Sequence, residues 1–274
     1  MTNLTISHKI KTINKVKHFQ TNMLSVERKL KIAEVVGKNG GVKTSDLSSM
    51  FNVSEMTILR DLSTLEDQGL LKRVYGGAVT FKKSTTELSI DLRKQLNAAE
   101  KNIIAQKALK LISDGDSIFL DSSTTALALA KKLSTRSGLT VITNGLEIIN
   151  EIKDEPGINT LCPGGQLQEN THSFIGSATE NFLRDYFADK AVISASGISL
   201  ESGITVENSI QAAIKKIMLK NALSRVVLVD SSKFDVVRLA KVCAIEDINI
   251  IVTDTKPPEK YMKLFLKNNI EVVF

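Results

Sequence analysis

The chain has 274 residues, 42% of them hydrophobic, and a formal net charge of +6. This length suits two domains, of which the larger can bury an ordinary core. No run approaches the roughly 18 apolar residues of a membrane-spanning helix, so we expect no membrane partner. Cys162 and Cys243 lie far apart without CxxC or Cys/His ligand spacing, which predicts no disulfide framework, no metal and no cofactor. We expect a cytoplasmic protein in which both cysteines are small buried apolar residues.

Residues 1–22 form a basic N-terminal extension that contains lysines but no acidic residue. It lacks the continuous apolar core of a signal peptide, so secretion is not indicated. Ile6, Ile10, Ile13 and Val16 have helical spacing, which leaves a DNA-gripping arm or an organellar presequence open. The plainer interpretations are a disordered tail or a mis-assigned translational start.

Two short helices around a tight turn are predicted from residue 44 onward. Thr44 can cap a helix that ends at Phe51, and Ser54 can cap a second helix that runs to about Gln68. Gly69 then stands where a left-handed C-cap is expected. This spacing is typical of a helix-turn-helix, although a helix pair is also a common structural unit.

The second of these helices is predicted to have one apolar and one polar side. Its apolar stripe, Ile58, Leu62 and Leu65, should pack on the first helix and the turn through Leu47, Phe51 and Val53. The side chains that we expect at a major groove are Ser54, Met56, Thr57, Arg60, Ser63 and Thr64.

A basic hairpin is predicted after the second helix. Residues 70–74 and 79–81 have strand composition, and residues 75–78 have the composition of a turn. Lys72, Arg73, Lys82 and Lys83 make this wing basic. The wing residues expected to contact DNA are Lys72, Arg73, Tyr75, Gly76 and Gly77.

Charge is segregated along the chain. Residues 1–83 contain 14 Lys/Arg against 7 Asp/Glu, whereas residues 84–274 contain 22 against 23. A positive excess confined to the part with the helix-turn-helix pattern is what neutralisation of DNA phosphates requires.

The run from Val53 to Leu62, with residues 65–66 and 69–78, resembles the N-terminal signature of the DeoR family of bacterial transcriptional repressors. That family usually has Thr-Ile-Arg-Arg-Asp-Leu and a His-Gly-Gly-Ala turn, whereas this chain has Leu59 and Tyr75 in place of the first arginine and the histidine. The resemblance implies operator DNA as a partner, with an altered operator preference. It also implies that the family's domain starts near Met23, so we expect the DNA-binding domain at 23–83.

The rest of the chain is predicted to be an α/β domain at 93–274, after a polar linker at 84–92. We expect one helix over Arg93–Ser113. The expected strands are Ser117–Leu120, Thr140–Thr143, Ile158–Cys162, Lys190–Ala195, Arg225–Val229 and Ile248–Val252. The expected helices between them are Ala126–Leu133, Leu146–Ile152, Ser177–Tyr186 and Ser209–Ala222. This alternation predicts a mainly parallel sheet with helices on both faces.

Polar residues follow several of the predicted strands. In open α/β sheets, ligands bind beyond the carboxyl ends of the strands, so these positions are candidates for an anion site. They are Asp121, Ser123, Thr124, Thr125, Asn144, Gly145, Gly164, Gly165 and Lys233. Taken singly, such residues are also ordinary caps and turns.

These positions again resemble the DeoR family, now its C-terminal sensor domain. The matching pieces are Glu100-Lys101, residues 115–121, 123–125, 143–144, 164–165, 174–176, 203–205 and 230–234. The resemblance implies a fold related to ribose-5-phosphate isomerase, a sugar-phosphate effector that also contacts Lys101, a repressor of carbohydrate utilisation, and a homodimer or homotetramer. Ser123 stands where the family has a glycine, which should narrow the backbone's approach to a phosphate.

Two alternatives stay open at this stage. A sugar-phosphate isomerase-like enzyme would need acids and a base beside the substrate, but the related isomerases' Asp-Gly-Ala-Asp loop falls at Ser194–Gly197 here, so no catalytic residue is predicted. A phosphate-binding scaffold that never contacts DNA would leave the basic N-terminal third as a solubilising or protein-binding domain.

Overall fold

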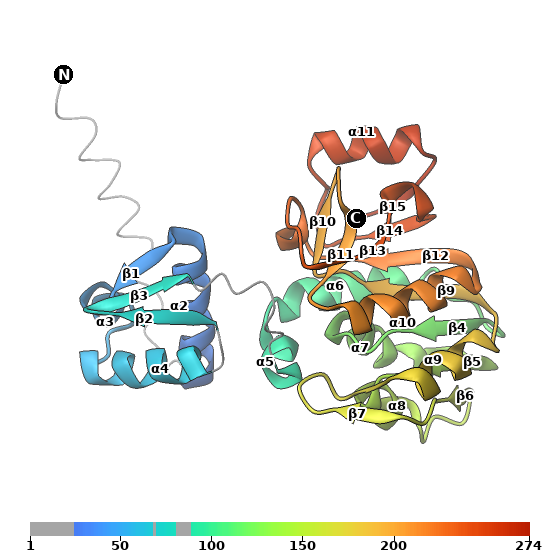
Figure 1. Cartoon of the computed structure of the whole chain (residues 1–274), viewed down its shortest axis with the longest axis horizontal. Coiled ribbons are helices and arrows are strands. Elements are labelled where there is room, and N and C mark those ends of the chain that lie inside the picture. The colour runs from blue at the N-terminus through green and yellow to red at the C-terminus, as the bar shows by residue number, and fades with distance from the viewer. Residues whose placement is uncertain (1–24, 68–69, 81–88) are drawn as a thin grey trace. The chain divides into compact units, whose positions relative to one another are not determined.

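The computed structural model describes residues 25–67, 70–80 and 89–274, and it divides into two compact units at residues 82 and 83 (Figure 1). The expectations for residues 1–22, for Gly69 and for most of the predicted linker lie outside the described residues, as do those for Lys82 and Lys83.

The N-terminal unit is a winged helix-turn-helix. Its elements are α2 (Ser25–Asn39), β1 (Gly41–Lys43), α3 (Thr44–Phe51), α4 (Glu55–Asp67), β2 (Leu71–Val74) and β3 (Gly77–Thr80), and its sheet has the order β1-β3-β2. Ile58, Leu62 and Leu65 of α4 are fully buried in one cluster with Leu47, against which Phe51 and Val53 pack. The predicted packing of the two helices is therefore confirmed.

The ends of the two helices follow the sequence only in part. Ser54 caps α4 as predicted, since its hydroxyl accepts a hydrogen bond from the Thr57 amide at 3.2 Å. The cap predicted for α3 is wrong: Lys43 is the N-cap, and Thr44 is buried with no hydrogen-bond partner for its hydroxyl among the described residues. The Thr44 amide instead donates to the Gly76 carbonyl, because α3 begins directly at the edge of the wing.

The wing turns more tightly than predicted. Val74 pairs with Gly77, so Gly77 and Ala78 belong to β3 and only Tyr75 and Gly76 form the loop. A side chain at Gly77 would lie 2.3 Å from the Val42 carbonyl, so β1 can approach β3 only at a glycine.

The C-terminal unit is built on a seven-stranded parallel sheet of order β15-β14-β12-β9-β4-β5-β6. Its strands are β4 (Ser117–Leu120), β5 (Leu139–Thr143), β6 (Ile158–Leu161), β9 (Ala188–Ser194), β12 (Ala222–Leu228), β14 (Ile250–Val252) and β15 (Glu271–Val273). The predicted parallel α/β fold is confirmed.

Helices cover both faces of this sheet (Figure 1). One face packs on α6 (Ala98–Leu109), α7 (Thr124–Ala130) and α8 (Leu146–Ile152), and the other on α9 (Ser177–Arg184), α10 (Ser209–Lys220) and α11 (Glu259–Lys267). Successive residues of β4 alternate between the layers, with Phe119 in one core cluster and Ile118 and Leu120 in the other. Because both faces are covered, the sheet edge at the strand ends is where polar groups can gather.

Several short elements were not predicted. They are the hairpin β7 (Gln166–Gln168) and β8 (Ser173–Ile175), and a second sheet of β10 (Gly197–Ser199), β11 (Gly203–Val206) and β13 (Ala240–Cys243). Three 3₁₀ turns also occur, η1 (Leu133–Thr135), η2 (Ser231–Lys233) and η3 (Ile245–Asp247). Strands of three or four residues are too short to leave a clear period in the sequence.

The single helix predicted over Arg93–Ser113 is wrong. The chain forms α5 (Ile90–Gln95), breaks at Leu96 and Asn97, and resumes as α6. Asn97 adopts a left-handed conformation with φ 51°, and its side-chain amide donates to Asp230 at 3.1 Å and to Ser232 at 3.2 Å. These hydrogen bonds to the segment after β12 stabilise the break between the two helices. Helix α5 also begins earlier than expected, within the stretch 84–92 that was predicted to be a linker.

The sheet has a topological switch between β4 and β9. From β4 the chain moves outward through β5 and β6, then returns to place β9 on the other side of β4. Helices consequently diverge above the carboxyl ends of these two strands, which opens a crevice of the kind that holds ligands in α/β proteins.

Candidate DNA-binding surface and effector site

The exposed side of α4 forms the first candidate surface. Met56 is 61% exposed and Arg60 is exposed beside it, while Thr57, Ser63 and Thr64 are half-buried. The Thr64 hydroxyl donates to the Arg60 carbonyl at 3.0 Å, so it is already engaged within the helix. Arg60 is therefore the long cationic side chain that α4 offers to a major groove.

Exposed wing residues lie next to this helix in the same unit. Tyr75 at the tip is fully exposed and Lys72 projects from β2. The Arg73 side chain is less available for DNA than that of Lys72, because its guanidinium lies 3.9 Å from the Glu66 carboxylate. The same carboxylate accepts a hydrogen bond from the Arg73 backbone amide at 2.9 Å. Gly76 lies in the loop, whereas Gly77 begins β3, where its lack of a side chain lets β1 approach.

A buried ion pair supports α4 from behind. The Arg28 Nε of α2 lies 2.6 Å from the Asp61 carboxylate, and only 4% of the Asp61 side chain is exposed. Asp61 directly follows Arg60, so this pair fixes the rotation of the helix that carries Arg60. The pair thus positions the candidate recognition face.

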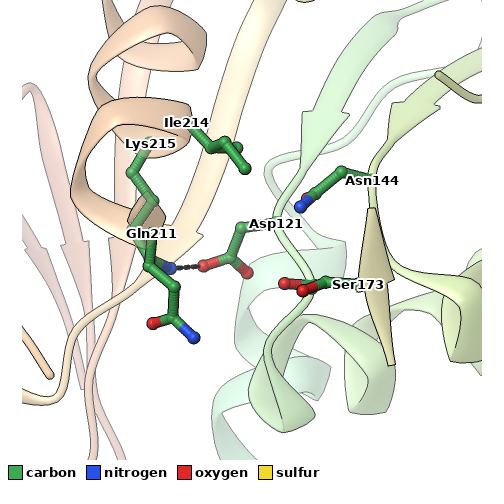
Figure 2. A pocket seen from close by; sticks show the side chains of 7 residues that line it. Asp121, Asn144, Ser173, Gln211, Ile214 and Lys215 are labelled. Atoms are coloured by element: carbon green, nitrogen blue, oxygen red, sulfur yellow. Dashed lines mark hydrogen bonds and ion pairs between the residues drawn. The ribbon is translucent and has the colours of Figure 1, made fainter. Parts of the chain in front are cut away.

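A pocket lies at the switch point of the C-terminal unit (Figure 2). Its empty volume is about 220 Å³, including the space at its open mouth. It is lined by Asp121, Ser122, Asn144, Ser173, Gln211, Ile214 and Lys215. Figure 2 shows side chains from the ends of β4 and β5, from β8 and from α10 converging on this space.

Asp121 is the most heavily bonded residue of the pocket. One carboxylate oxygen accepts from the Ser123 amide and hydroxyl, and the other accepts from the Ser194 amide at 2.8 Å and from the Lys215 ammonium. Both members of the ion pair are at least nine-tenths buried. Asp121 therefore joins β4, β9 and α10, and its oxygens are already occupied.

The loop after β4 does not need the glycine that the family usually has. Ser123 has φ −84° and ψ 156°, an extended backbone that any residue adopts, and its hydroxyl accepts from the Ala126 amide to cap α7. The Ser123 side chain, which was expected to narrow the approach of the backbone to a phosphate, is hydrogen-bonded to the Asp121 carboxylate and to the Ala126 amide. Thr124 and Thr125 follow as buried residues of the first turn of α7.

A second polar cluster lies where β12 ends. Lys101, 8% exposed, donates to the carbonyls of Arg93 and Leu96 at the end of α5. The pKa of Lys101 is lowered to about 8, first by burial and then by the nearby charge of Lys233, while Asp230 acts in the opposite direction. Three cations, Lys101, Lys233 and Arg93, thus lie with two carboxylates, Asp230 and Glu100, at the carboxyl edge of the sheet, which we call the rim.

The structure does not gather every predicted effector residue in one place. Asn144 and Asp121 line the pocket, whereas Lys101 and Lys233 belong to the second cluster. Gly145 packs against Ser122, and a side chain there would lie 3.0 Å from the Ser122 Cα. Gly164 and Gly165 lie against Thr179 at the start of α9, and Thr124 and Thr125 lie in α7.

Five residues that line the pocket are not among the effector residues predicted from the sequence: Ser122, Ser173, Gln211, Ile214 and Lys215. Lys215 carried a usable signal, because it lies among the apolar residues Ile214, Ile217 and Met218 of a helix that had been predicted. A lysine on a buried helical face needs a partner, which is here Asp121, 94 residues away.

Two family models match the chain. The model described as "DeoR-like helix-turn-helix domain" matches residues 28–84, and the one described as "DeoR C terminal sensor domain" matches residues 96–255. The chain belongs to the DeoR family. This DeoR-family protein is a DNA-binding transcriptional regulator, since the first model covers its winged helix-turn-helix and its curated relatives are named as regulators.

Three relatives align over most of the DeoR-family chain. The HTH-type transcriptional regulator GolR of Listeria innocua is 36% identical over 89% of this chain and 96% of its own length. The transcriptional repressor AccR of Agrobacterium fabrum is 35% identical over 89% and 97%. The lactose phosphotransferase system repressor of Staphylococcus epidermidis is 32% identical over 92% and 100%. These names do not favour the isomerase-like alternative.

Solved structures resemble the fold of this DeoR-family protein more distantly. Ribose 5-phosphate isomerase A from Methanocaldococcus jannaschii is 23% identical and covers 50% of this chain and 55% of its own, with a TM-score of 0.38. eIF2B delta from Chaetomium thermophilum is 13% identical and covers 93% of this chain and 79% of its own, with a TM-score of 0.45.

Within residues 25–67, 70–80 and 89–274, no helix is long and apolar enough to span a membrane. The same residues contain no group of three or more His, Cys, Asp and Glu side chains that could hold a metal ion.

Proposed function

We propose that this regulator represses a carbohydrate-utilisation operon and that a phosphorylated sugar, bound at the carboxyl rim of the parallel sheet, changes its affinity for operator DNA. The observation that carries the effector assignment is the group of three cations, Lys101, Lys233 and Arg93, which outnumber the two carboxylates among them and lie on the same edge of the sheet as an open pocket lined mostly by polar residues. Ammonium and guanidinium groups at a sheet rim suit a phosphate, and the pocket suits the uncharged part of the ligand.

Helix α5 supports a route from the effector site toward the winged head. It is the first described helix of the C-terminal unit, directly after residues 81–88. Lys101 holds the carbonyls at its C-terminal end, and the Ile90 amide at its start donates to the Asn170 carbonyl at 2.8 Å. Both ends of α5 are therefore bonded to residues near the rim.

Hydrogen bonds among three side chains, here called the triad, also hold α5 in place. Glu147 of α8 lies 2.5 Å from Lys94 of α5 and 2.6 Å from the His172 ring. Hydrogen bonds from Lys94 and then from His172 lower the pKa of Glu147, and they outweigh its partial burial. For Lys94, burial disfavours the charge, but its bonds to Glu147 and Asp91 dominate and raise its pKa.

The pocket and the triad share the segment 170–174. Ser173 lines the pocket, His172 contacts Glu147, and the Asn170 carbonyl accepts from α5. We infer that an effector that displaces this segment alters the hold on α5 and hence the presentation of the winged head. Because coupling between sites is reciprocal, operator DNA must then alter effector affinity by the same factor.

Operator binding is tested with the full chain and the DNA upstream of its own gene. Fluorescence anisotropy should show binding that weakens steeply with salt and that changes when phosphorylated sugars are added. Failure to bind this DNA specifically would favour the scaffold alternative. Conversion of a sugar phosphate into its isomer, with turnover, would favour the isomerase-like enzyme.

The coupling route has its own test. Glu147→Gln should leave operator affinity and effector affinity within about twofold but abolish the effect of the effector on operator binding, because the link between α5 and residues 170–174 is weakened. Glu151→Gln is the matched control, since Glu151 is exposed on the same helix. A fully responsive Glu147→Gln protein would overturn this route while leaving the effector site intact.

Paired half-sites require paired heads, so we propose that at least a dimer binds the operator in the cytoplasm, as a homodimer or homotetramer. Sedimentation with operator fragments carrying one or two half-sites tests this directly. A monomer that binds one half-site as tightly as the full operator would contradict it.

A further inference from the structure

Asn144 presents an unusual group to the pocket. Its side chain is 2% exposed, and its Nδ2 donates to the Phe174 carbonyl at 3.0 Å. That bond fixes the amide orientation, because a carbonyl can accept only from the nitrogen. The opposite atom, Asn144 Oδ1, is buried without a hydrogen-bond partner among the described residues.

An unpartnered buried acceptor is unfavourable, so a pocket that keeps one is suited to a ligand that brings a donor. Figure 2 shows the Asn144 amide extending into the space between Asp121 and Ser173. Ser173 adds a hydroxyl that lies 2.7 Å from the Thr171 hydroxyl, and Ile214 adds an apolar wall. These groups suit a carbon chain that carries hydroxyls.

The same groups do not suit a phosphate. An ionised phosphate oxygen accepts hydrogen bonds, so Asn144 Oδ1 would face it acceptor to acceptor. Lys215 does not change this balance, because its charge is matched by Asp121 at the wall of the pocket. Lys101 and Lys233, in contrast, form the cationic cluster at the end of β12.

We propose that the pocket at Asn144 and Ser173 is a hydroxyl-reading subsite, which binds the polyol end of the effector and sets its specificity. This assignment rests on the proposed function, in which Lys101 and Lys233 bind the phosphate. In the strand order β12-β9-β4-β5, the end of β4 at the near wall of the pocket lies about 10 Å from the end of β12, and the end of β5, which Asn144 follows, lies about 14 Å from it. An extended sugar phosphate, with a hydrogen bond at each end, can span this distance. The effector therefore lies across the end of β9.

The test uses isothermal titration of the full chain with inorganic phosphate and five compounds: glycerol 3-phosphate, ribose 5-phosphate, glucose 6-phosphate, glucitol 6-phosphate and glucosamine 6-phosphate. For whichever sugar phosphate binds, Asn144→Ala should weaken binding by roughly 10- to 100-fold, the cost of losing a buried hydrogen bond. Inorganic phosphate should bind the variant and the parent alike. Asn150→Ala, at an exposed position of α8, is the matched control.

A second arm needs no variant and so does not depend on the folding of one. Deoxy analogues of the bound compound are titrated into the unchanged chain, and one of them should bind more weakly by a similar factor, because it lacks the hydroxyl that donates to Asn144. Equal affinity of every deoxy analogue would overturn the subsite. Preference for glucosamine 6-phosphate over glucose 6-phosphate would identify an amine as the donor instead of a hydroxyl and overturn the hydroxyl assignment.

The outcomes separate the two proposals. Equal affinity of Asn144→Ala and the parent for the sugar phosphate, or an equal loss for inorganic phosphate, overturns the subsite. If no sugar phosphate binds the parent, the sugar-phosphate effector of the proposed function is overturned, and the subsite with it.

Discussion

The winged head and the C-terminal unit each hold a buried carboxylate against a cation, but they use it differently. In the head, Asp61 is fixed by Arg28 and the adjacent Arg60 points outward. In the C-terminal unit, Asp121 is fixed by Lys215 within the pocket itself. The candidate recognition residue of the head, Arg60, is thus exposed on a buried support, whereas the candidate ligand-binding residues of the rim, Asp121 and Asn144, are themselves buried.

This difference predicts that support and recognition can be separated in the head but not at the rim. The largest effect should come from Asp121→Asn, which leaves the Lys215 ammonium buried without its counter-charge. Breaking such a pair costs about 3–5 kcal/mol, so the C-terminal unit should unfold at lower urea and lose effector binding together. Hydrogen exchange on the full chain locates the loss.

The double variant Asp121→Asn/Lys215→Met is the control for this prediction. Removal of both charges should recover part of the stability, because no unpaired charge stays buried. It should not recover effector binding if the pair also shapes the pocket. If Asp121→Asn alone were as stable to urea as the parent, the Asp121–Lys215 ion pair would not stabilise the C-terminal unit.

The second effect is the corresponding change in the head. Asp61→Asn should destabilise the head by about 3 kcal/mol, toward the lower end of the range, because the Arg28 side chain is 11% exposed and can regain water. Operator binding should fall while effector binding stays unchanged, as measured by anisotropy and titration of the same preparation. Loss of effector binding would contradict the separation of the two units.

Much of the head was predictable from sequence because its signals are local. The Ser54 cap, the stripe at Ile58, Leu62 and Leu65, and the basic wing all lie within about 30 residues. The cap predicted at Thr44 was wrong because the contact there is not local: the Thr44 amide donates a hydrogen bond to Gly76, 32 residues away. Short-range patterns do not encode such contacts.

The rim was predictable only in outline for the same reason. Strand ends and their following polar residues are local, so Asp121 and Asn144 were found. Lys215 and Ser173 reach the pocket through long-range topology, and the break at Asn97 depends on Asp230, 133 residues away. A sequence pattern places a residue on an element, but the order of the strands decides which elements meet.

The third effect concerns recognition alone. Arg60→Ala should weaken operator binding by about 1–3 kcal/mol if the guanidinium binds a base at two points, and should leave stability unchanged because Arg60 is exposed. Anisotropy with operators altered at single base pairs measures this, and specificity should relax at one position of each half-site. Uniform weakening at every position would instead assign Arg60 to a phosphate.

The smallest effect tests whether a buried group at the rim contacts the ligand. Because burial lowers the pKa of Lys101 to about 8, its ammonium is charged at pH 7 and largely neutral by pH 9. A phosphate favours the charged form, so effector affinity should be constant from pH 7 to about 8 and then fall by up to tenfold per pH unit. Titration calorimetry between pH 7 and 9.5 measures this.

Folding stability should change in the opposite direction over the same range. The unfolded chain keeps the Lys101 proton up to pH 10.5, whereas the folded chain releases it near 8, so the contribution of this group to stability rises between those values. A fall in affinity above pH 8 therefore cannot be attributed to unfolding through Lys101. Lys101→Arg keeps its charge throughout and should abolish the fall. If the effector affinity of that variant fell with pH as in the parent, Lys101 would not contact the effector, and its role would be to hold the end of α5 through the Arg93 and Leu96 carbonyls.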